Sequence, residues 1–206
     1  MEDTDSQALR PEDVRVIPED WMAPLPPATM FAEGQPLEVD VGCGKGRFLL
    51  ARAAAHPAVS FLGIERQLVR VRKVAKKAAR AGLRNVRVLR CESSYAIAYL
   101  IGAPCVSTYY IFFPDPWPKK RHHKRRLFTP SFLDALAATL VPAGRVHIAT
   151  DHMNYFEQIL QLLRNDARFR EIPPFVPREQ ERTDFELIFL NNEARIGRCS
   201  FQRSDD

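Results

Sequence analysis

The sequence has few cysteines and lacks long apolar runs. Four of its 206 residues are cysteines, and no two stand in a C-x-x-C pair. No His/Cys cluster has zinc-ligand spacing, which argues against a disulfide scaffold and a structural zinc site, and we expect no metal. No apolar run reaches the roughly 18 residues of a membrane span, and the acidic N-terminus does not resemble a secretory signal peptide. These absences predict a soluble, cytoplasmic protein with no membrane contact.

Acidic residues are missing from two stretches of the chain. Residues 1–40 carry ten acidic and two basic side chains, whereas residues 41–206 carry 15 acidic and 28 basic ones. Residues 66–90 contain ten Lys/Arg and no acid, and residues 117–126 contain six Lys/Arg and two histidines. Such clusters attract polyanions, so we expect a nucleic-acid partner.

The chain divides into an N-terminal arm and one domain. Residues 1–34 are acidic and proline-rich, and we expect a mobile arm with little regular structure. We expect residues 35–206 to form a single domain. Apolar strand patterns alternate with helical ones there, which predicts an α/β fold with a doubly wound, mainly parallel, Rossmann-like sheet. The last two strands are expected to form an antiparallel C-terminal hairpin. The predicted strands are 36–41, 59–65, 85–90, 107–113, 144–150, 185–190 and 196–201, and the predicted helices are 47–56, 67–81, 93–101, 129–140 and 152–165.

A glycine-rich turn lies between the first predicted strand and the first helix. Residues 40–46 read DVGCGKG, and Gly42 and Gly44 let a ligand approach the backbone. Glu65 ends the next strand, 19 residues after Gly46, where a carboxylate can bind a ribose diol. This arrangement predicts a cofactor that contains adenosine.

Asp40 favours one such cofactor over another. The third glycine comes one residue earlier than in the dinucleotide pattern G-x-G-x-x-G, and a carboxylate at position 40 would clash with a pyrophosphate. The same carboxylate can bind the ammonium group of S-adenosylmethionine, which we therefore favour over NAD. Glu92 follows the third strand and suits the adenine ring, although an acid there also favours the start of a helix.

The stretch after the fourth strand combines an acid, an aromatic ring and a basic run. Asp115 stands between two prolines that restrict its backbone, and it is expected to lie at the carboxyl end of the sheet, where open α/β folds bind ligands. Trp117 offers a face for stacking on a base. The basic residues that follow are suited to phosphates.

The residues FFPDPWPKKRHHKRR (112–126) closely resemble the signature of the tRNA (guanine-N7)-methyltransferase family. Three further matches follow the family order: LGIE at 62–65, ATD at 149–151 and TDFE at 183–186. The resemblance runs from about Leu37 to Phe201. It implies a class I methyltransferase fold and transfer of a methyl group from S-adenosylmethionine to N7 of a guanosine in the variable loop of tRNA, at position 46 of the tRNA.

The resemblance also implies roles for individual residues. Asp115 would be the catalytic residue and would also contact the cofactor. The other cofactor contacts would be Asp40, Gly42, Gly44, Glu65 and Glu92. Substrate-binding residues would be Lys119, Arg121, His122, His123, Lys124, Arg125, Arg126, Asp151, Thr183, Asp184, Phe185 and Glu186. Family members resemble monomers or homodimers, and both remain open here.

Two other functions are compatible with the residues. One is methylation of a different nitrogen of a nucleic acid, although amino-methyltransferases carry an Asp/Asn-Pro-Pro-aromatic motif and this chain reads Pro-Asp-Pro-Trp. The other is a non-catalytic RNA-binding protein that keeps a vestigial cofactor pocket. Identification of the methylated base tests the first alternative, and cofactor binding tests the second.

Overall fold

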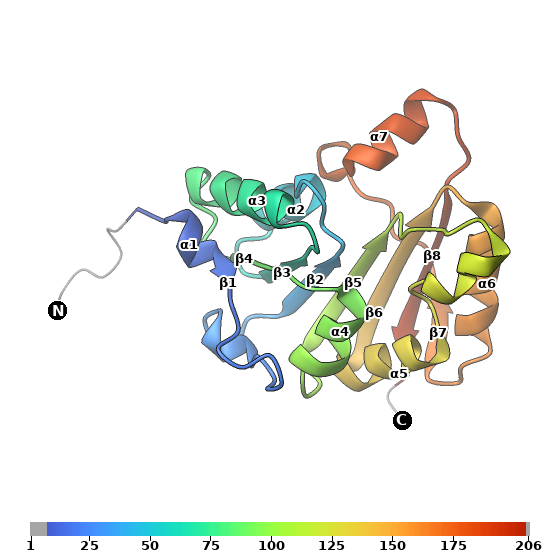
Figure 1. Ribbon diagram of the computed structural model, residues 1–206, viewed down its shortest axis with the longest axis horizontal. Coiled ribbons are helices and arrows are strands. Elements are labelled where there is room, and N and C mark those ends of the chain that lie inside the picture. Colours follow the sequence, from blue (N-terminus) through green and yellow to red (C-terminus); the bar gives the residue numbers. More distant parts are fainter. Residues whose placement is uncertain (1–7, 205–206) are drawn as a thin grey trace.

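The computed structural model describes residues 8–204, which form one mixed sheet flanked by helices (Figure 1). The strand order is β1-β4-β3-β2-β5-β6-β8-β7. The strands from β1 to β6 in this order pair in parallel, and β8 is antiparallel to both β6 and β7. The strands are β1 (Arg15–Val16), β2 (Leu37–Val41), β3 (Ser60–Ile64), β4 (Val86–Leu89), β5 (Val106–Phe112), β6 (Leu140–Thr150), β7 (Phe169–Ile172) and β8 (Gly197–Arg203).

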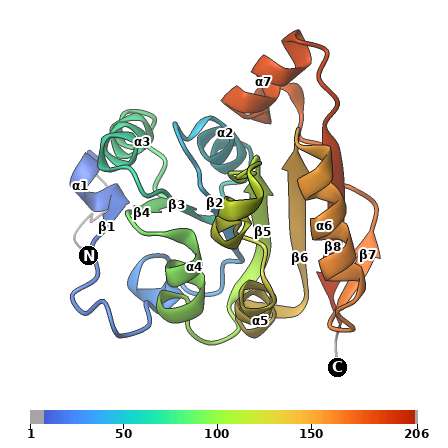
Figure 2. The same ribbon diagram turned by 45° about the vertical axis from the view of Figure 1, so that its right-hand side comes forward.

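Helices cover both faces of the sheet (Figure 2). One face carries α1 (Pro11–Val14), α2 (Arg47–Ala55) and α3 (Leu68–Arg80). The other carries α4 (Ser93–Tyr95), which continues as a π-helical turn η2 (Ala96–Leu100), together with α5 (Pro130–Thr139) and α6 (Met153–Arg164). Helix α7 (Asp184–Asn191) lies beyond the carboxyl ends of β5 and β6 (Figures 1 and 2). The short helical turns are η1 (Pro27–Thr29), η3 (Lys120–Arg125) and η4 (Glu179–Glu181).

The apolar side chains divide between the two faces as the helical patterns predict. In α3, Val71, Val74, Ala75 and Ala78 are buried in one cluster with residues of α2, β3 and β4. The larger cluster joins α5 and α6 to β5, β6 and β8. The basic residues of α3 remain on its solvent side. The prediction of a doubly wound sheet is therefore confirmed. Separately, no helix in residues 8–204 is long and apolar enough to cross a lipid bilayer.

The order of the parallel strands reverses between β2 and β5. Strands β3 and β4 extend the sheet from β2 in one direction, and β6 extends it from β5 in the other. The connections that leave β2 and β5 therefore diverge to opposite faces and open a crevice at the carboxyl edge. The glycine turn and the proline-rich loop both start at this edge.

The predicted C-terminal hairpin is wrong in one of its two strands. Residues 185–190 are helical in α7. Strand β8 pairs antiparallel with β6 on one side and, on the other, with β7, which the sequence analysis missed. Thr183 begins α7 because its Oγ1 accepts a hydrogen bond from the Glu186 backbone N at 3.0 Å. A Thr followed by Glu three residues later is a helix-start pattern, so the sequence did contain this signal.

The predicted N-terminal arm is more regular than expected. Residues 11–16 form α1 and β1, and Arg15 and Val16 pair with Val88 and Leu89 of β4. Val14 is fully buried. The prediction of little regular structure was therefore wrong for this segment, because one apolar side chain and two strand residues complete the edge of the sheet. Residues 1–7 lie outside the described part, and the mobility of the arm stays a prediction.

Gly63 in β3 allows α2 to pack closely against the sheet. A Cβ at this position would lie 2.6 Å from Cδ2 of Leu49 and 2.9 Å from Sγ of Cys43. We expect Gly63→Ala to lower the free energy of unfolding by about 1–3 kcal/mol, measured by urea denaturation. In a Leu49→Ala background the same change should cost less, because the closest atom is gone. Equal costs in both backgrounds would contradict this explanation.

Candidate active site

The glycine turn after β2 leaves backbone exposed to open space. Gly42, Gly44 and Gly46 have φ values of 77°, 57° and 75°, which favour glycine. The backbone N–H groups of Gly42 and Cys43 donate to the Ile64 carbonyl at 2.8 and 2.9 Å, which ties the turn to β3. A Cβ at Gly42 would meet no atom within 4 Å, whereas one at Gly46 would lie 2.8 Å from Val74. Gly42 thus borders space for a ligand, and Gly46 is required for packing.

Two buried carboxyl groups lie beside this turn. Asp40 at the end of β2 and Glu65 just after β3 are 5% and 6% exposed. Glu65 accepts hydrogen bonds from the Gln67 backbone N at 2.7 Å and from Nη1 of Arg70 at 3.4 Å. Within residues 8–204 the Asp40 carboxyl has no such partner, and burial, followed by the charge of Glu65, raises its pKa to about 7. A buried acid without a cation fits a positively charged ligand group.

Glu92 has a structural contact of its own. It stands at the N-cap of α4, where its carboxylate accepts from the Tyr95 backbone N at 2.9 Å and from Oγ of Ser94 at 3.3 Å. This is the helix-start explanation that the sequence also allowed. The side chain is exposed at the carboxyl edge of the sheet, so its contact with adenine stays a prediction.

The loop after β5 is strained on both sides of residues 114–116, the proline segment. Phe113 and Trp117 have φ values of 54° and 42°, which non-glycine residues rarely adopt and which cost about 1–3 kcal/mol each. Asp115 between them is exposed. The loop is held from outside: the Phe113 backbone N donates to the Ala149 carbonyl at 2.7 Å, and Nε of Arg126 donates to the Pro116 carbonyl at 2.7 Å.

The faces of Trp117 are partly covered by its own loop. The Arg125 guanidinium lies 4.9 Å from the indole centroid, and the His122 ring packs edge-on at 5.7 Å. These contacts differ from the open stacking face that the sequence suggested. Arg125 thus covers part of the indole and adds a positive charge beside it.

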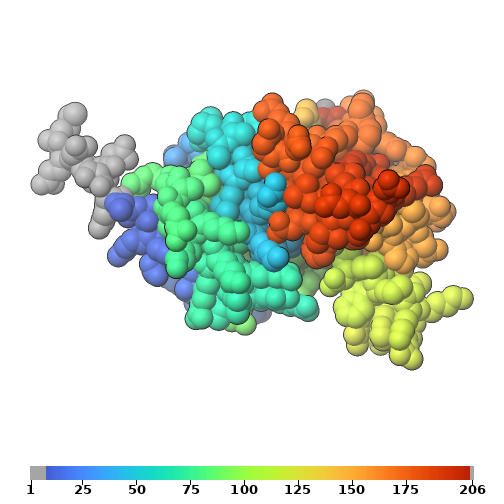
Figure 3. Space-filling model, turned by 90° about the horizontal axis from the view of Figure 1, so that it is seen from above, coloured from blue at the N-terminus to red at the C-terminus, as the bar shows by residue number. Residues whose placement is uncertain are grey.

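The basic run divides into exposed residues and one buried residue. Lys119, Arg121, Lys124 and Arg125 are exposed, and His122 and His123 are half-buried. Seen from above the carboxyl edge, the yellow-green residues of η3 project from the surface (Figure 3). Arg126 is only 6% exposed and contacts other parts of the protein. The sequence predicted a substrate contact for all of these residues, and the structure places Arg126 away from the surface.

Helix α7 brings the TDFE residues to the same edge. Phe113 packs on Phe189 of α7, with 5.3 Å between ring centroids. Phe185 is half exposed and Asp184 is partly exposed, whereas Glu186 is 2% exposed and forms an ion pair with Arg198 of β8. One Glu186 oxygen, Oε2, is buried with no hydrogen-bond partner within residues 8–204. Glu186 therefore anchors α7 and keeps one acceptor free. Asp151 is exposed at the end of β6.

A buried polar network that the sequence analysis missed holds the segment leading to α7. Arg52 of α2 donates to the Tyr110 hydroxyl at 3.1 Å and to Glu181 at 3.3 Å, and the Tyr110 hydroxyl donates to Glu38 at 2.9 Å. Phe175 packs over the same guanidinium. An arginine on the apolar side of a helix was the available signal. The network holds Glu181 of η4, the turn that leads to α7.

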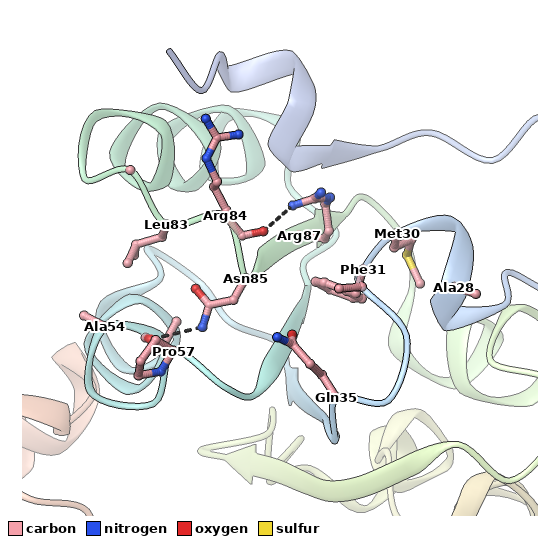
Figure 4. A pocket seen from close by; sticks show the side chains of 13 residues that line it. Ala28, Met30, Phe31, Gln35, Ala54, Pro57, Leu83, Arg84, Asn85 and Arg87 are labelled. Carbon is pink, nitrogen blue, oxygen red and sulfur yellow. Dashed lines mark hydrogen bonds between the residues drawn. The ribbon is translucent and has the colours of Figure 1, made fainter. Parts of the chain in front are cut away.

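The cavity in Figure 4 lies at the opposite end of the sheet. It has a volume of about 500 Å³ and is lined by Gln35, Pro57 and Asn85, which precede β2, β3 and β4. Asn85 uses its amide to donate to the carbonyls of Ala53, His56 and Val59, so it is a structural residue. None of the predicted site residues lines this cavity. The carboxyl edge, where Asp40, Glu65 and Asp115 gather, is the better candidate site.

A doubly wound sheet with an open glycine turn and carboxylates at its carboxyl edge defines a class I methyltransferase. A family model described as "Putative methyltransferase" matches residues 34–195. The tRNA (guanine-N(7)-)-methyltransferase of Halorhodospira halophila is 43% identical over 81% of this chain and 74% of its own length. That of Nitrosococcus oceani is 36% identical over 89% and 78%. The chain belongs to the tRNA (guanine-N(7)-)-methyltransferase family, which confirms the resemblance.

Solved structures agree with the fold. The 16S rRNA methyltransferase KamB superposes with a TM-score of 0.63 at 16% sequence identity, covering 82% of this chain and 88% of that one. At this identity the likeness concerns the fold alone.

Proposed function

We propose that this protein transfers a methyl group from S-adenosylmethionine to N7 of a guanosine in tRNA, in the cytoplasm, and that the guanosine is the variable-loop base at position 46. Family membership supports the reaction. The observation that carries the proposal is the gathering of Asp40, Glu65 and Asp115 at the edge where strand order reverses.

The residues at the edge fit the cofactor. Asp40 is buried and has no cationic partner among the described residues, so it suits the ammonium group, and Glu65 suits the ribose hydroxyls. The open backbone at Gly42 and Gly44 borders the space between them. Glu92, which follows β4 at the same edge, is the residue we expect to contact the adenine. When bound, this cofactor supplies a methyl group that is electrophilic because it is attached to a sulfonium.

The chain's own residues position the base and stabilise charge. N7 of guanine has an in-plane lone pair and needs no deprotonation, so no general base is required. The protein holds the base in line with the methyl group. Methylation makes the purine cationic, and we expect the exposed carboxylates of Asp115 and Asp151 to stabilise that charge. We expect Glu186 to accept from N1–H and the amino group of guanine, which would discriminate against adenine. Its Oε2 has no hydrogen-bond partner within residues 8–204 but is buried, so this contact requires the carboxylate to become accessible when tRNA binds.

Two basic surfaces are suited to contact the RNA. The first is the solvent side of α3, and the second is the η3 run. Seen from above the edge, the green-teal helix and the yellow-green run are separate parts of the same face (Figure 3). We expect phosphates of the tRNA to contact both, with the target base unpaired because an A-form major groove is too narrow for the reaction. The exposed basic residues of α3 are Arg72, Lys73, Lys76, Lys77 and Arg80.

The direct test uses an unmodified tRNA transcript and labelled S-adenosylmethionine. Reduction followed by aniline treatment cleaves RNA at 7-methylguanosine, so one cut in the variable loop is the expected result. A transcript with adenosine at that position should neither incorporate label nor be cut. Incorporation of label without cleavage would show that an atom other than N7 of guanine is methylated. No incorporation across a full tRNA pool would favour a non-catalytic RNA-binding protein.

Lys124→Ala is expected to weaken tRNA binding mainly through electrostatics. Loss of one phosphate contact should reduce the slope of log K against log salt by roughly 1. The measurement is filter binding between low and moderate salt. Arg145→Ala is the control, because Arg145 is exposed near the amino end of β6 and should leave the slope unchanged. Equal slopes for wild type and Lys124→Ala would remove Lys124 from the RNA contact.

A further inference from the structure

Arg126 is buried at the end of a run of exposed basic residues. Its exposed fraction is 6%, whereas Lys124 and Arg125 are exposed. A buried guanidinium is costly unless its N–H groups are paired. Nε and Nη1 of Arg126 are paired, whereas its buried Nη2 has no hydrogen-bond partner within residues 8–204. The contacts of the two paired nitrogens indicate what the burial of Arg126 achieves.

These contacts join the proline segment to α6. Nε of Arg126 donates to the Pro116 carbonyl at 2.7 Å, and Nη1 donates to Oε1 of Gln158. The guanidinium lies 4.6 Å from the centroid of the Tyr155 ring. The Tyr155 hydroxyl accepts from the Phe128 backbone N at 3.2 Å. Arg126 thus connects the loop to two residues of α6, the buried Tyr155 and the exposed Gln158.

The proline segment needs an external restraint. Pro114 and Pro116 have no N–H groups, so the segment has few hydrogen bonds of its own to offer. Trp117 follows with a positive φ, a conformation that persists only when its surroundings impose it. The Pro116 carbonyl, one residue after Asp115, is the group that Arg126 holds.

The Asp115 carboxylate lies near the same anchor. Burial raises the pKa of Tyr155, and the charge of Asp115 contributes to the increase. Asp115 therefore lies within electrostatic reach of the ring on which Arg126 stacks. Within residues 8–204, no hydrogen bond to the Asp115 side chain is present, so its position depends on the backbone of the loop.

We infer that Arg126 is a positioning residue, which fixes the backbone of residues 114–116 and through it the Asp115 carboxylate, and is not a contact of the RNA. This inference rests on the proposed function. Arg126 touches neither cofactor nor base in this role. Its loss should affect the methyl-transfer step more than the binding of tRNA.

Arg126→Lys distinguishes the two roles because it keeps the charge. A lysine has no planar group to stack on Tyr155 and cannot bridge Pro116 and Gln158 in the same geometry. We expect kcat to fall roughly 100-fold, as for a small displacement of a catalytic group, with KM for tRNA within about twofold of wild type. The slope of log K against log salt should not change.

Gln158→Ala provides an independent variant on α6. It removes the acceptor for Nη1 of Arg126 and should lower kcat by about fivefold, also with unchanged KM. Gln161→Ala, which changes an exposed glutamine on the same helix, should match wild type. Thermal unfolding and cofactor affinity, measured for every variant, show whether the fold and the cofactor site are intact.

Three outcomes would overturn the inference. The first is a wild-type kcat for Arg126→Lys, since a positive charge at position 126 would then be enough to position Asp115. The second is a raised KM and a reduced salt slope in Arg126→Lys, which an RNA contact predicts. The third is Gln158→Ala with wild-type kcat. Wild-type protein that makes no 7-methylguanosine would instead contradict the proposed function.

Discussion

Replacing Asp115 with asparagine is expected to slow methyl transfer roughly 100- to 1000-fold. Asparagine has nearly the same shape as aspartate but no charge, so it cannot stabilise the positive charge that develops on the purine. Asp115 is exposed and makes no side-chain hydrogen bond within residues 8–204, so the fold should not change. The measurement is a single-turnover rate at saturating tRNA and cofactor, which separates the chemical step from binding.

Glu157→Gln is a suitable control for the charge change. Glu157 is an exposed acid on α6, outside the proposed site, and its replacement should leave the rate unchanged. Thermal unfolding should be the same for wild type and both variants. Full turnover by Asp115→Asn would show that the carboxylate of Asp115 is not catalytic. Asp151 would then be the residue expected to stabilise the charge on the purine.

Asp40→Asn is expected to abolish cofactor binding and, above neutral pH, to stabilise the ligand-free protein. The pKa of Asp40 is raised from its ordinary 3.8 to about 7 in the folded state. Between these values the folded protein retains a proton that the unfolded chain releases, so the free energy of unfolding falls as pH rises. Above pH 7 this change lowers the free energy of unfolding by at most about 4 kcal/mol. Asparagine stays neutral, so the variant avoids this loss.

Thermal unfolding with and without S-adenosylmethionine checks both effects. Without ligand, Asp40→Asn should unfold at a higher temperature than wild type at pH 8, and the difference should shrink toward pH 4. With ligand, the increase in unfolding temperature seen for wild type should disappear. Wild-type affinity should rise between pH 6 and pH 8, because the ionised carboxylate binds the ammonium group. Glu157→Gln, which replaces an exposed acid on α6, is the control for charge alone.

A variant that unfolds at a lower temperature than wild type at pH 8 would contradict the raised pKa. A variant that keeps the ligand-induced stabilisation would contradict the contact between Asp40 and the cofactor. The two outcomes are independent, because the first concerns burial of the acid and the second concerns its partner.

The parallel part of the fold could be predicted from local patterns. Each of its strands except β1 is an apolar run next to a helical one, and α3 has its buried residues at helical spacing, so the sequence pattern and the packing agree. Residues 185–190 were predicted wrongly because Phe, Leu and Ile suit a strand as well as a helix. There the hydrogen bond from the Glu186 backbone N to Thr183 starts a helix, and β8 pairs with β7.

The candidate site was predictable in its acids and less so in its basic residues. Asp40, Glu65 and Asp115 end or follow strands, and parallel strands bring their carboxyl ends to one edge. Arg125 and Arg126 are neighbours with the same side chain. One lies exposed against Trp117 and the other is buried against Tyr155, a residue that is 29 positions further along the chain.

The sequence by itself determined the order of strands and helices from β2 to α6, the open glycine turn, the acids at the strand ends and the excess of basic residues beyond residue 40. These features depend on neighbours within a few residues and on side-chain chemistry. Only the tertiary structure decided which basic residue is buried, which acid lacks a partner, and that α7 lies beyond the carboxyl edge. These features depend on contacts between segments far apart in the chain, where burial changes the free energy of a charge and no local pattern records it.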